Sequence, residues 1–191
     1  MYYAIVTEPS REPLTVDNAK DYLRIDESFN DDNAMILMHI AAARERFQEA
    51  TGQVLVPTEF QAAFDNWPDD NVIRLFKVPL LSVTGITYYD TQGNEQTLSA
   101  DDLHIDAVSK PARLVPVAGR WPSVDGRPGG IKLRFTSGYA DGKVPKFIKH
   151  ALLLMVGHFY DNRTEVTPEQ LNVMPRGVDS VIEMYSVKEH R

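Results

Sequence analysis

The side chains best suited to chemistry in this 191-residue sequence are a histidine and an aspartate at the end of its most apolar segment. His158 and Asp161 are three residues apart, and this spacing places two side chains on one face of a helix. Such a pair predicts proton transfer between an acid and a base, with Glu165 as a third candidate member of the site. A hydrogen bond at a helix end is the alternative interpretation, since no nucleophile is tied to the pair by a local motif.

Other signatures of catalysis are missing from the sequence. It contains neither of the two glycine-rich motifs that cradle phosphates, and its five histidines include no pair with the spacing of a metalloprotease. Cysteine is absent, so disulfides and thiolate metal sites are excluded. We therefore expect no enzyme activity and no metal or cofactor.

A cluster of positive charge precedes the same apolar segment. Lys143, Lys146 and Lys149, followed by His150, predict a surface close to DNA or to an acidic partner, although a solvated helix edge is the alternative. The formal net charge of the whole chain is −7. An acidic protein is poorly suited to clamp DNA by neutralising phosphates, but it suits a passage along which DNA slides.

Two tryptophans are expected in loops, and each is followed by proline. Trp67 and Trp121 are large aromatic side chains in polar surroundings. Such residues either fill the interior of a domain or anchor a partner. The sequence leaves both interpretations open.

The most apolar segment predicts a central helix over about 145–160. Ile148, Leu152, Met155 and Phe159 form one stripe, and Leu153 and Leu154 fill other faces. We expect this helix to be covered on more than one side, by its own chain or by another copy. Its apolar run is far shorter than the roughly 20 residues that a membrane span needs, and the start of the chain does not resemble a secretory signal. Folding in a cytoplasm without membrane insertion is therefore expected.

The remaining helices are predicted from similar patterns. A long helix over about 31–51 has an inner stripe that includes Ile36, Ile40 and Phe47, and we expect Arg44 and Glu45 on its solvent side. Shorter helices are predicted over about 16–24, after Thr15 as N-cap, and over 178–185. The segment 164–191 is expected to act as a docking arm.

The middle of the chain follows a different pattern. Residues 54–136 contain β-branched and aromatic residues in short alternating runs, which predict about six strands. We therefore expect an α+β fold with a mainly helical core, formed by the helices at about 31–51, about 145–160 and the C-terminal end, and with a small antiparallel sheet inserted at 54–136. The whole chain, 1–191, is predicted to be a single domain.

A recognisable order of residues runs through the chain. Near its start the ordered residues are Leu14, Thr15, Tyr22, Leu23, Arg24, Ile25, Asp31, Asp32, Thr51 and Gly52. Later fragments are Pro79-Leu80, Pro111 to Leu114, Trp121-Pro122, 131–139, 144–153, 158–160, Asn162-Arg163 and Pro175 to Val178. In this order and spacing the chain resembles the head–tail connector (adaptor) proteins of tailed bacteriophages and prophages.

This resemblance implies assembly rather than catalysis. It implies a structural protein that forms a ring of about twelve copies under the portal of a DNA-filled head, joins the head to the tail or to a stopper protein, and lines the DNA exit channel. The implied partners are other copies of the chain, the portal and a tail-completion or stopper protein, with DNA only in transit. The protein would assemble in the host cytoplasm and reside in the virion neck.

The residues expected at these contacts follow from the same patterns. Those expected at a subunit or partner interface are Trp67, Trp121, Leu153, Leu154, Arg176, Val178 and Tyr185, and those nearest DNA are Lys143, Lys146 and Lys149. Two alternatives remain: a small cytoplasmic acid–base enzyme using His158 and Asp161, and a DNA-contacting packaging or completion factor using the three lysines.

Overall fold

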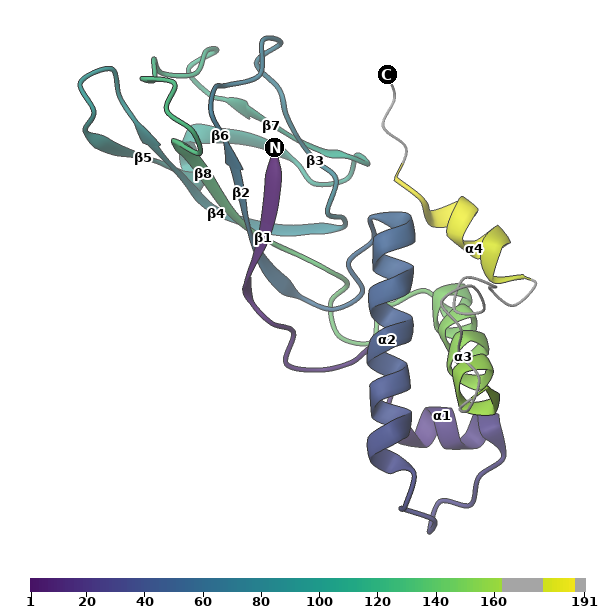
Figure 1. Cartoon of the computed structure of the whole chain (residues 1–191). Helices are drawn as coiled ribbons and strands as arrows, with labels where there is room; N and C mark the ends of the chain where they lie inside the picture. Colours follow the sequence, from purple (N-terminus) through teal and green to yellow (C-terminus); the bar gives the residue numbers. More distant parts are fainter. Residues whose placement is uncertain (163–176, 188–191) are drawn as a thin grey trace. The chain divides into compact units, whose positions relative to one another are not determined.

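The chain folds into two compact units (Figure 1). The computed structural model describes residues 1–162 and 177–187. A helical unit is formed by residues 10–55 and the described residues of 140–186, and a sheet unit mainly by residues 1–9 and 56–139. Each unit has its own buried apolar side chains. Among the described residues, no helix has the length and apolar character needed to cross a bilayer.

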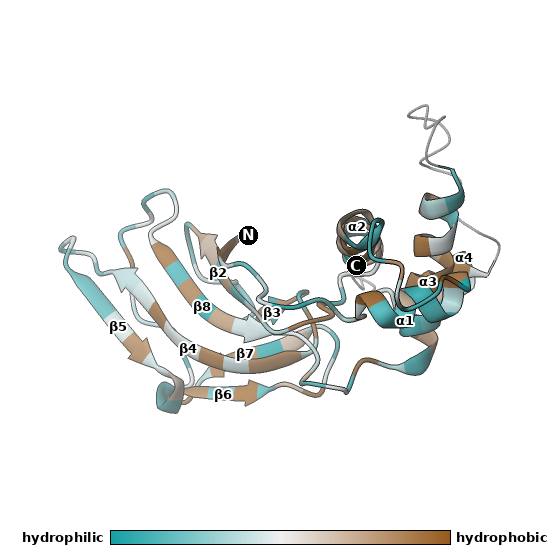
Figure 2. Ribbon diagram, turned by 90° about the horizontal axis from the view of Figure 1, so that it is seen from below, coloured by the Kyte–Doolittle hydropathy of each residue, from teal (hydrophilic) through white to brown (hydrophobic). Residues whose placement is uncertain are grey.

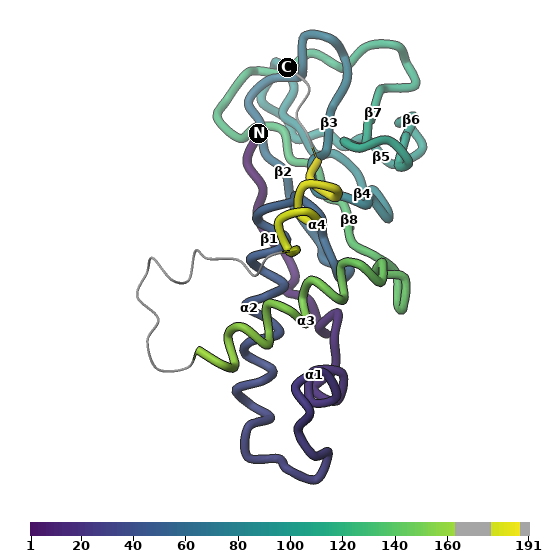
Figure 3. The backbone as a smooth tube through the Cα atoms, turned by 90° about the vertical axis from the view of Figure 1, so that its right-hand side faces the viewer, coloured from purple at the N-terminus to yellow at the C-terminus, as the bar shows by residue number. Residues whose placement is uncertain are grey.

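Four α-helices make up the described part of the helical unit: α1 (Val16–Leu23), α2 (Asn33–Thr51), α3 (Lys146–Asp161) and α4 (Val178–Tyr185). Their bounds confirm the predicted helices to within two residues. The long helix α2 contacts each of the other three, and Figure 3 shows α3 crossing it. Ile36, Ile40 and Phe47 of α2 are fully buried, as their spacing predicts.

Local signals explain where the helices begin and end. The Thr15 hydroxyl accepts a hydrogen bond from the Asn18 N–H, and the Asn18 side chain accepts one from the Thr15 N–H, which forms a reciprocal cap on α1. Pro145 precedes α3, where a missing N–H costs nothing. Gly52 ends α2 in the left-handed conformation, with a φ of 72°.

A buried lysine fixes the loop between α1 and α2. The side chain of Lys20 is 1% exposed, and its Nζ donates to the Glu27 carbonyl oxygen at 3.0 Å and to Asn30 Oδ1 at 3.2 Å. Burying an ammonium group is unfavourable unless hydrogen bonds compensate it. These two acceptors therefore hold the loop against α1.

Replacing this lysine should release the loop. In Lys20→Met the apolar stem is largely kept, but both acceptors lose their donor, so we expect a loss of about 2 kcal/mol in the free energy of unfolding. Hydrogen exchange should be faster at the Phe29 and Asn33 amides, which donate to Asp26 and Asn30 within the loop. Unchanged exchange at both amides would contradict this role of Lys20.

The described residues of the sheet unit form eight strands in two antiparallel sheets. The five-stranded sheet has the order β1 (Tyr2–Thr7), β2 (Thr58–Phe64), β8 (Ile131–Ser137), β4 (Leu80–Tyr89) and β5 (Glu95–Ser99). The three-stranded sheet has the order β3 (Ile73–Leu75), β7 (Ala112–Pro116) and β6 (Leu103–Asp106). These strands and the helices make a mixed α+β fold.

The prediction of a mainly helical core with a small inserted sheet is wrong. Alternate residues of β8 are fully buried, namely Ile131, Leu133 and Phe135, and Figure 2 shows hydrophobic and hydrophilic residues alternating along this strand. Phe135 is paired in register with Phe60 of β2, and their rings stack with centroids 5.7 Å apart. The strands therefore bury an apolar core of their own and are not a small insertion into a helical core.

An aspartate organises the turn between β6 and β7. The Asp106 carboxylate accepts a hydrogen bond from the Ser109 hydroxyl at 2.7 Å and one from Arg113 Nη2 at 2.6 Å. The serine hydroxyl, followed by the arginine, holds the pKa of Asp106 well below its ordinary value of 3.8.

This lowered pKa predicts acid sensitivity of the turn. A carboxylate with a lowered pKa in the folded state stabilises the protein above the unfolded-state value near 3.8, and this contribution is lost as the pH falls below it. Asp106→Asn should therefore have a lower urea midpoint than wild type at neutral pH, and the difference should narrow in acid. The control is Asp101→Asn, at a neighbouring exposed residue. A difference independent of pH would contradict the prediction.

Candidate assembly surfaces

The predicted acid–base pair lies in a shallow pocket of the helical unit. His158 and Asp161, both on α3, line a cavity of about 550 Å³ together with residues of α1 and its C-terminal cap. Gly157 lines the same pocket, and a Cβ atom added there would lie 3.1 Å from the Tyr22 ring. Two members of the candidate site are therefore near each other, whereas Glu165 lies outside the described residues.

The two groups do not form the pair that proton transfer needs. His158 Nδ1 lies 3.3 Å from Nδ2 of Asn162, the residue that ends α3, and the same Nδ2 donates to the His158 carbonyl oxygen at 2.7 Å. No hydrogen bond joins His158 to Asp161 in the part of the chain that the structure describes. The ring is thus oriented by a polar contact at the helix end.

An exposed aromatic residue that the sequence interpretation overlooked lies among the predicted lysines along the chain. Phe147 is 64% exposed in the first turn of α3. Lys146 and His150 are exposed on the same helix, and Lys143 is exposed in the turn that leads into it. We call Lys143, Lys146, Phe147 and His150 the basic–aromatic face. Lys149, which is half-buried, lies beside it.

The positive charge of this face is not compensated locally. The first turn of α3 contains no acidic residue, although the dipole of a helix favours negative charge at that end. Asp141, which is close in sequence, is bound to Arg11 at 2.6 Å. Among the described residues, none of the three lysines has an ion-pair partner. The positive charge of this face is therefore available to bind an acidic surface.

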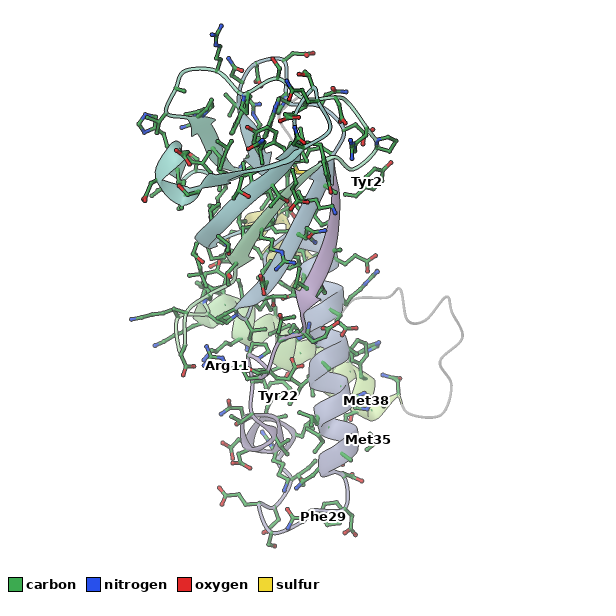
Figure 4. All side chains as sticks on the ribbon, turned by 90° about the vertical axis from the view of Figure 1, so that its left-hand side faces the viewer. Tyr2, Arg11, Tyr22, Phe29, Met35 and Met38 are labelled. Carbon is green, nitrogen blue, oxygen red and sulfur yellow. The ribbon has the colours of Figure 1, made fainter. Side chains whose placement is uncertain are left out.

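A second apolar stripe follows the exposed side of α2. It consists of Ala34, Leu37, Met38, Ala41 and Ala42, at the three- and four-residue spacing of a helix face. Leu37 is 48% exposed and Met38 is 61% exposed. In Figure 4, where α2 lies in front of α3, Met38 is labelled on the N-terminal half of α2. We call these five residues the α2 outer stripe.

Arg44 is not on the solvent side of α2, where the sequence interpretation placed it. Its residue exposure is 7%, and its guanidinium group binds Glu12 in a bidentate manner, with Nε to Oε2 at 2.7 Å and Nη2 to Oε1 at 3.2 Å. Glu45 is exposed as predicted. The buried ion pair ties the segment before α1 to the middle of α2.

The two tryptophans form a stacked pair inside the sheet unit. The ring centroids of Trp67 and Trp121 are 4.4 Å apart with an interplanar angle of 8°. Each indole N–H donates to a backbone carbonyl oxygen, from Trp67 to Pro122 at 2.7 Å and from Trp121 to Asn71 at 3.1 Å. Trp121 is buried and Trp67 is half-buried. Both rings thus contribute to the interior packing of this unit.

The other predicted interface residues lie on α3 and α4. Leu153 and Leu154 are half-buried on α3, while Val178, the first residue of α4, is fully buried. The Tyr185 carbonyl oxygen accepts a hydrogen bond from Gln53 Nε2 at 2.7 Å, which fixes the end of α4 within the helical unit. Arg176, together with residues 164–175 and 188–191 of the predicted docking arm, lies outside the described residues.

The sheet unit also has an apolar edge that the sequence interpretation did not single out. Strand β1 is at one end of the five-stranded sheet, and Tyr2, Ile5 and Val6 are 84%, 51% and 42% exposed. The strand contains no charged residue. An edge of this kind favours pairing with another strand, and natural proteins usually protect it.

Comparisons with known proteins identify the fold. No protein-family model matches the sequence, and no curated protein matches it. The chain is similar to a protein in the neck of an empty gene transfer agent (GTA) particle, computed with C6 symmetry, with a TM-score of 0.83 and 22% identity. It is also similar to proteins in the virion of a native GTA particle (TM-score 0.81, 22% identity) and in the neck of a native GTA particle computed with C12 symmetry (TM-score 0.78, 21% identity).

These similarities extend over complete chains. In each comparison the alignment covers 100% of this chain and 98% of the other. The shared fold therefore includes both the helical unit and the sheet unit.

Proposed function

We propose that the protein is a structural component of the neck of a tailed phage or phage-like particle, where it forms a ring between the portal and the tail or stopper. The observation that carries this proposal is the full-length similarity of fold to GTA neck proteins. The connector-like order of residues in the sequence supports the same assignment independently. In this role the protein acts by binding other proteins and has no catalytic turnover.

The similar necks were computed with C6 and with C12 symmetry, which fits a ring, and a ring of about twelve copies is compatible with both symmetries. The surface of the chain also suits assembly, because the α2 outer stripe and β1 expose apolar side chains in each unit. The net charge of −7 suits a channel through which DNA passes without being held.

The burial of the predicted contact residues separates those that stabilise the fold from those that remain available to a partner. Trp121 and Val178 are buried within their own units, so we assign them to folding rather than to the ring contact. Leu153, Leu154 and Trp67 are half-buried and keep part of their surface for a partner. The described helix of the C-terminal arm offers Met184, which is 68% exposed, for docking to a neighbouring component.

The same three lysines support a DNA-contacting completion factor as the rival function. That function predicts duplex DNA binding whose logarithmic affinity falls by about 0.9 per neutralised phosphate for each tenfold rise in salt. Replacing Lys143, Lys146 and Lys149 with glutamine would then abolish most of the salt dependence. Under the neck proposal, DNA binding by the free protein is weak and the replacement leaves it unchanged.

Reconstitution of particles tests the proposed function. Filled heads purified from a producer that lacks this gene should have portals but no attached tails. Adding the purified protein, followed by the remaining neck proteins and tails, should restore complete particles. Equal restoration without the protein, or failure of the protein to bind portal-bearing heads, would contradict the proposal.

A further inference from the structure

The α2 outer stripe is an apolar surface on the side of α2 that faces away from the core of the helical unit. The core of the helical unit is served by Ile36, Ile40 and Phe47, each fully buried on the opposite face of α2. Residues 33–43 contain no Asp, Glu, Lys or Arg, so the solvent side lacks the charges that usually cover an amphipathic helix. This stripe is therefore suited to a contact outside the single chain.

The composition of the stripe indicates what kind of surface it accepts. Two large apolar side chains, Leu37 and Met38, are accompanied on this face by the small side chains of Ala34, Ala41 and Ala42. A large apolar side chain from another molecule can pack between the side chains of such a helix face. Toward the C-terminal end of α2 the exposed side includes Glu45 and Glu49, whose side chains are 69% and 78% exposed although they also pair with Arg44 at 3.3 Å and with Arg46 at 3.9 Å.

The basic–aromatic face has the complementary chemistry. Phe147 offers a large ring that is 64% exposed, and Lys143 and Lys146 supply positive charge without an ion-pair partner among the described residues. One face thus combines exposed apolar side chains with two exposed carboxylates, and the other combines an exposed aromatic ring with ammonium groups. Both faces belong to the helical unit of the same chain.

We propose that Phe147 of one copy packs on the α2 outer stripe of the next copy, with Lys146 beside Glu45, and that this contact propagates the ring. The inference rests on the proposed function. Because the two faces differ, the contact is heterologous, and repetition of such a contact gives a closed ring when its rotation closes. The second copy therefore supplies the cover that the α2 outer stripe lacks.

The absence of cysteine allows a direct test. Met38→Cys and Phe147→Cys are prepared singly and together in the full chain and oxidised under assembly conditions. We expect the double variant to give a ladder of covalently joined multimers that a reductant collapses, because each copy then joins two neighbours. Each single variant should remain uncrosslinked, since each of its contacts contains only one thiol.

The possible results of this test distinguish failure of the proposed contact from failure of the proposed function. Disulfide dimers from Met38→Cys alone would overturn the proposal by showing a symmetric contact between two α2 helices. Absence of a ladder from a double variant that still forms rings would overturn the contact but leave the neck function standing. Failure of wild type to form a ring even on portal-bearing heads would overturn both.

A charge exchange gives a second test without new covalent bonds. Lys146→Glu should raise the protein concentration needed for half-assembly about fivefold to tenfold, and adding Glu45→Lys should restore assembly. The matched control is Lys132→Glu, at an exposed position on β8 of the sheet unit, which should assemble as wild type does. If Lys146→Glu weakened duplex DNA binding and left assembly unchanged, the lysine would serve DNA and the proposed contact would be wrong.

Discussion

Gly138→Ala should cost about 4 kcal/mol of unfolding free energy or prevent folding of the sheet unit altogether. Gly138 follows β8 with a φ of +137°, a region that side chains rarely adopt. A Cβ atom there would lie 2.5 Å from the Val56 carbonyl carbon, closer still to its oxygen, and 2.7 Å from the Pro57 nitrogen. All three atoms are backbone, so no side chain can move aside to relieve the collision.

A second glycine distinguishes the two causes of the expected loss of unfolding free energy, which are the positive φ and the collision with backbone atoms. Gly119 also has a positive φ, +78°, but a Cβ added there meets nothing within 4 Å. Gly119→Ala should therefore show only the conformational cost, about 1 kcal/mol. Urea denaturation of both variants measures the difference. Equal losses would contradict the role of the backbone contact between Gly138 and the chain before β2.

Arg44→Met should destabilise the helical unit by about 3 kcal/mol. The side chains of Arg44 and Glu12 are only 9% and 18% exposed, so removal of the guanidinium group leaves a largely buried carboxylate without its cation. In the double variant Arg44→Met with Glu12→Leu, much of the stability should return, because neither charge is then buried. Thermal or urea unfolding of the two variants measures both effects.

An exposed ion pair of the same unit provides the control. Arg11 and Asp141 are 2.6 Å apart, but their side chains are 39% and 86% exposed. Arg11→Met should therefore change the free energy of unfolding by less than about 1 kcal/mol. A loss from Arg44→Met no larger than that from Arg11→Met would show that burial of the pair does not determine its contribution.

The helices could be predicted because their signals are local. Thr15 and Asn18 lie within one turn of each other, and Pro145 and Gly52 mark helix ends wherever they occur in a suitable pattern. Alternation likewise identified β8 before its partners were known. Each of these features needs only a few neighbouring residues.

The features that escaped prediction depend on distant parts of the chain. The two sheets arise from pairings such as Phe60 with Phe135, for which the sequence contains no local signal, and the helical core was overestimated for that reason. Arg44 was assigned to solvent because a lone charge on a helix usually is exposed. Its partner Glu12 comes from 32 residues earlier.

The candidate surfaces likewise include features that the sequence predicts and features that it does not. The three lysines were identified by their spacing, but the exposed Phe147 between them was counted only as part of an apolar segment. Apart from Asn33 and His39, residues 33–43 are apolar, so periodicity predicts the inner stripe and gives no sign of the outer one. The assembly function itself was predicted from family resemblance, because individual residues without catalytic motifs do not specify a partner.

The most direct test of a neck function is the mass of the purified protein in solution across a range of concentrations, alone and with portal-bearing heads, followed by electron microscopy of the large species. We predict closed rings of about twelve copies, either in solution or on the portal. A tight dimer that persists at all concentrations and does not bind portal-bearing heads would contradict the account.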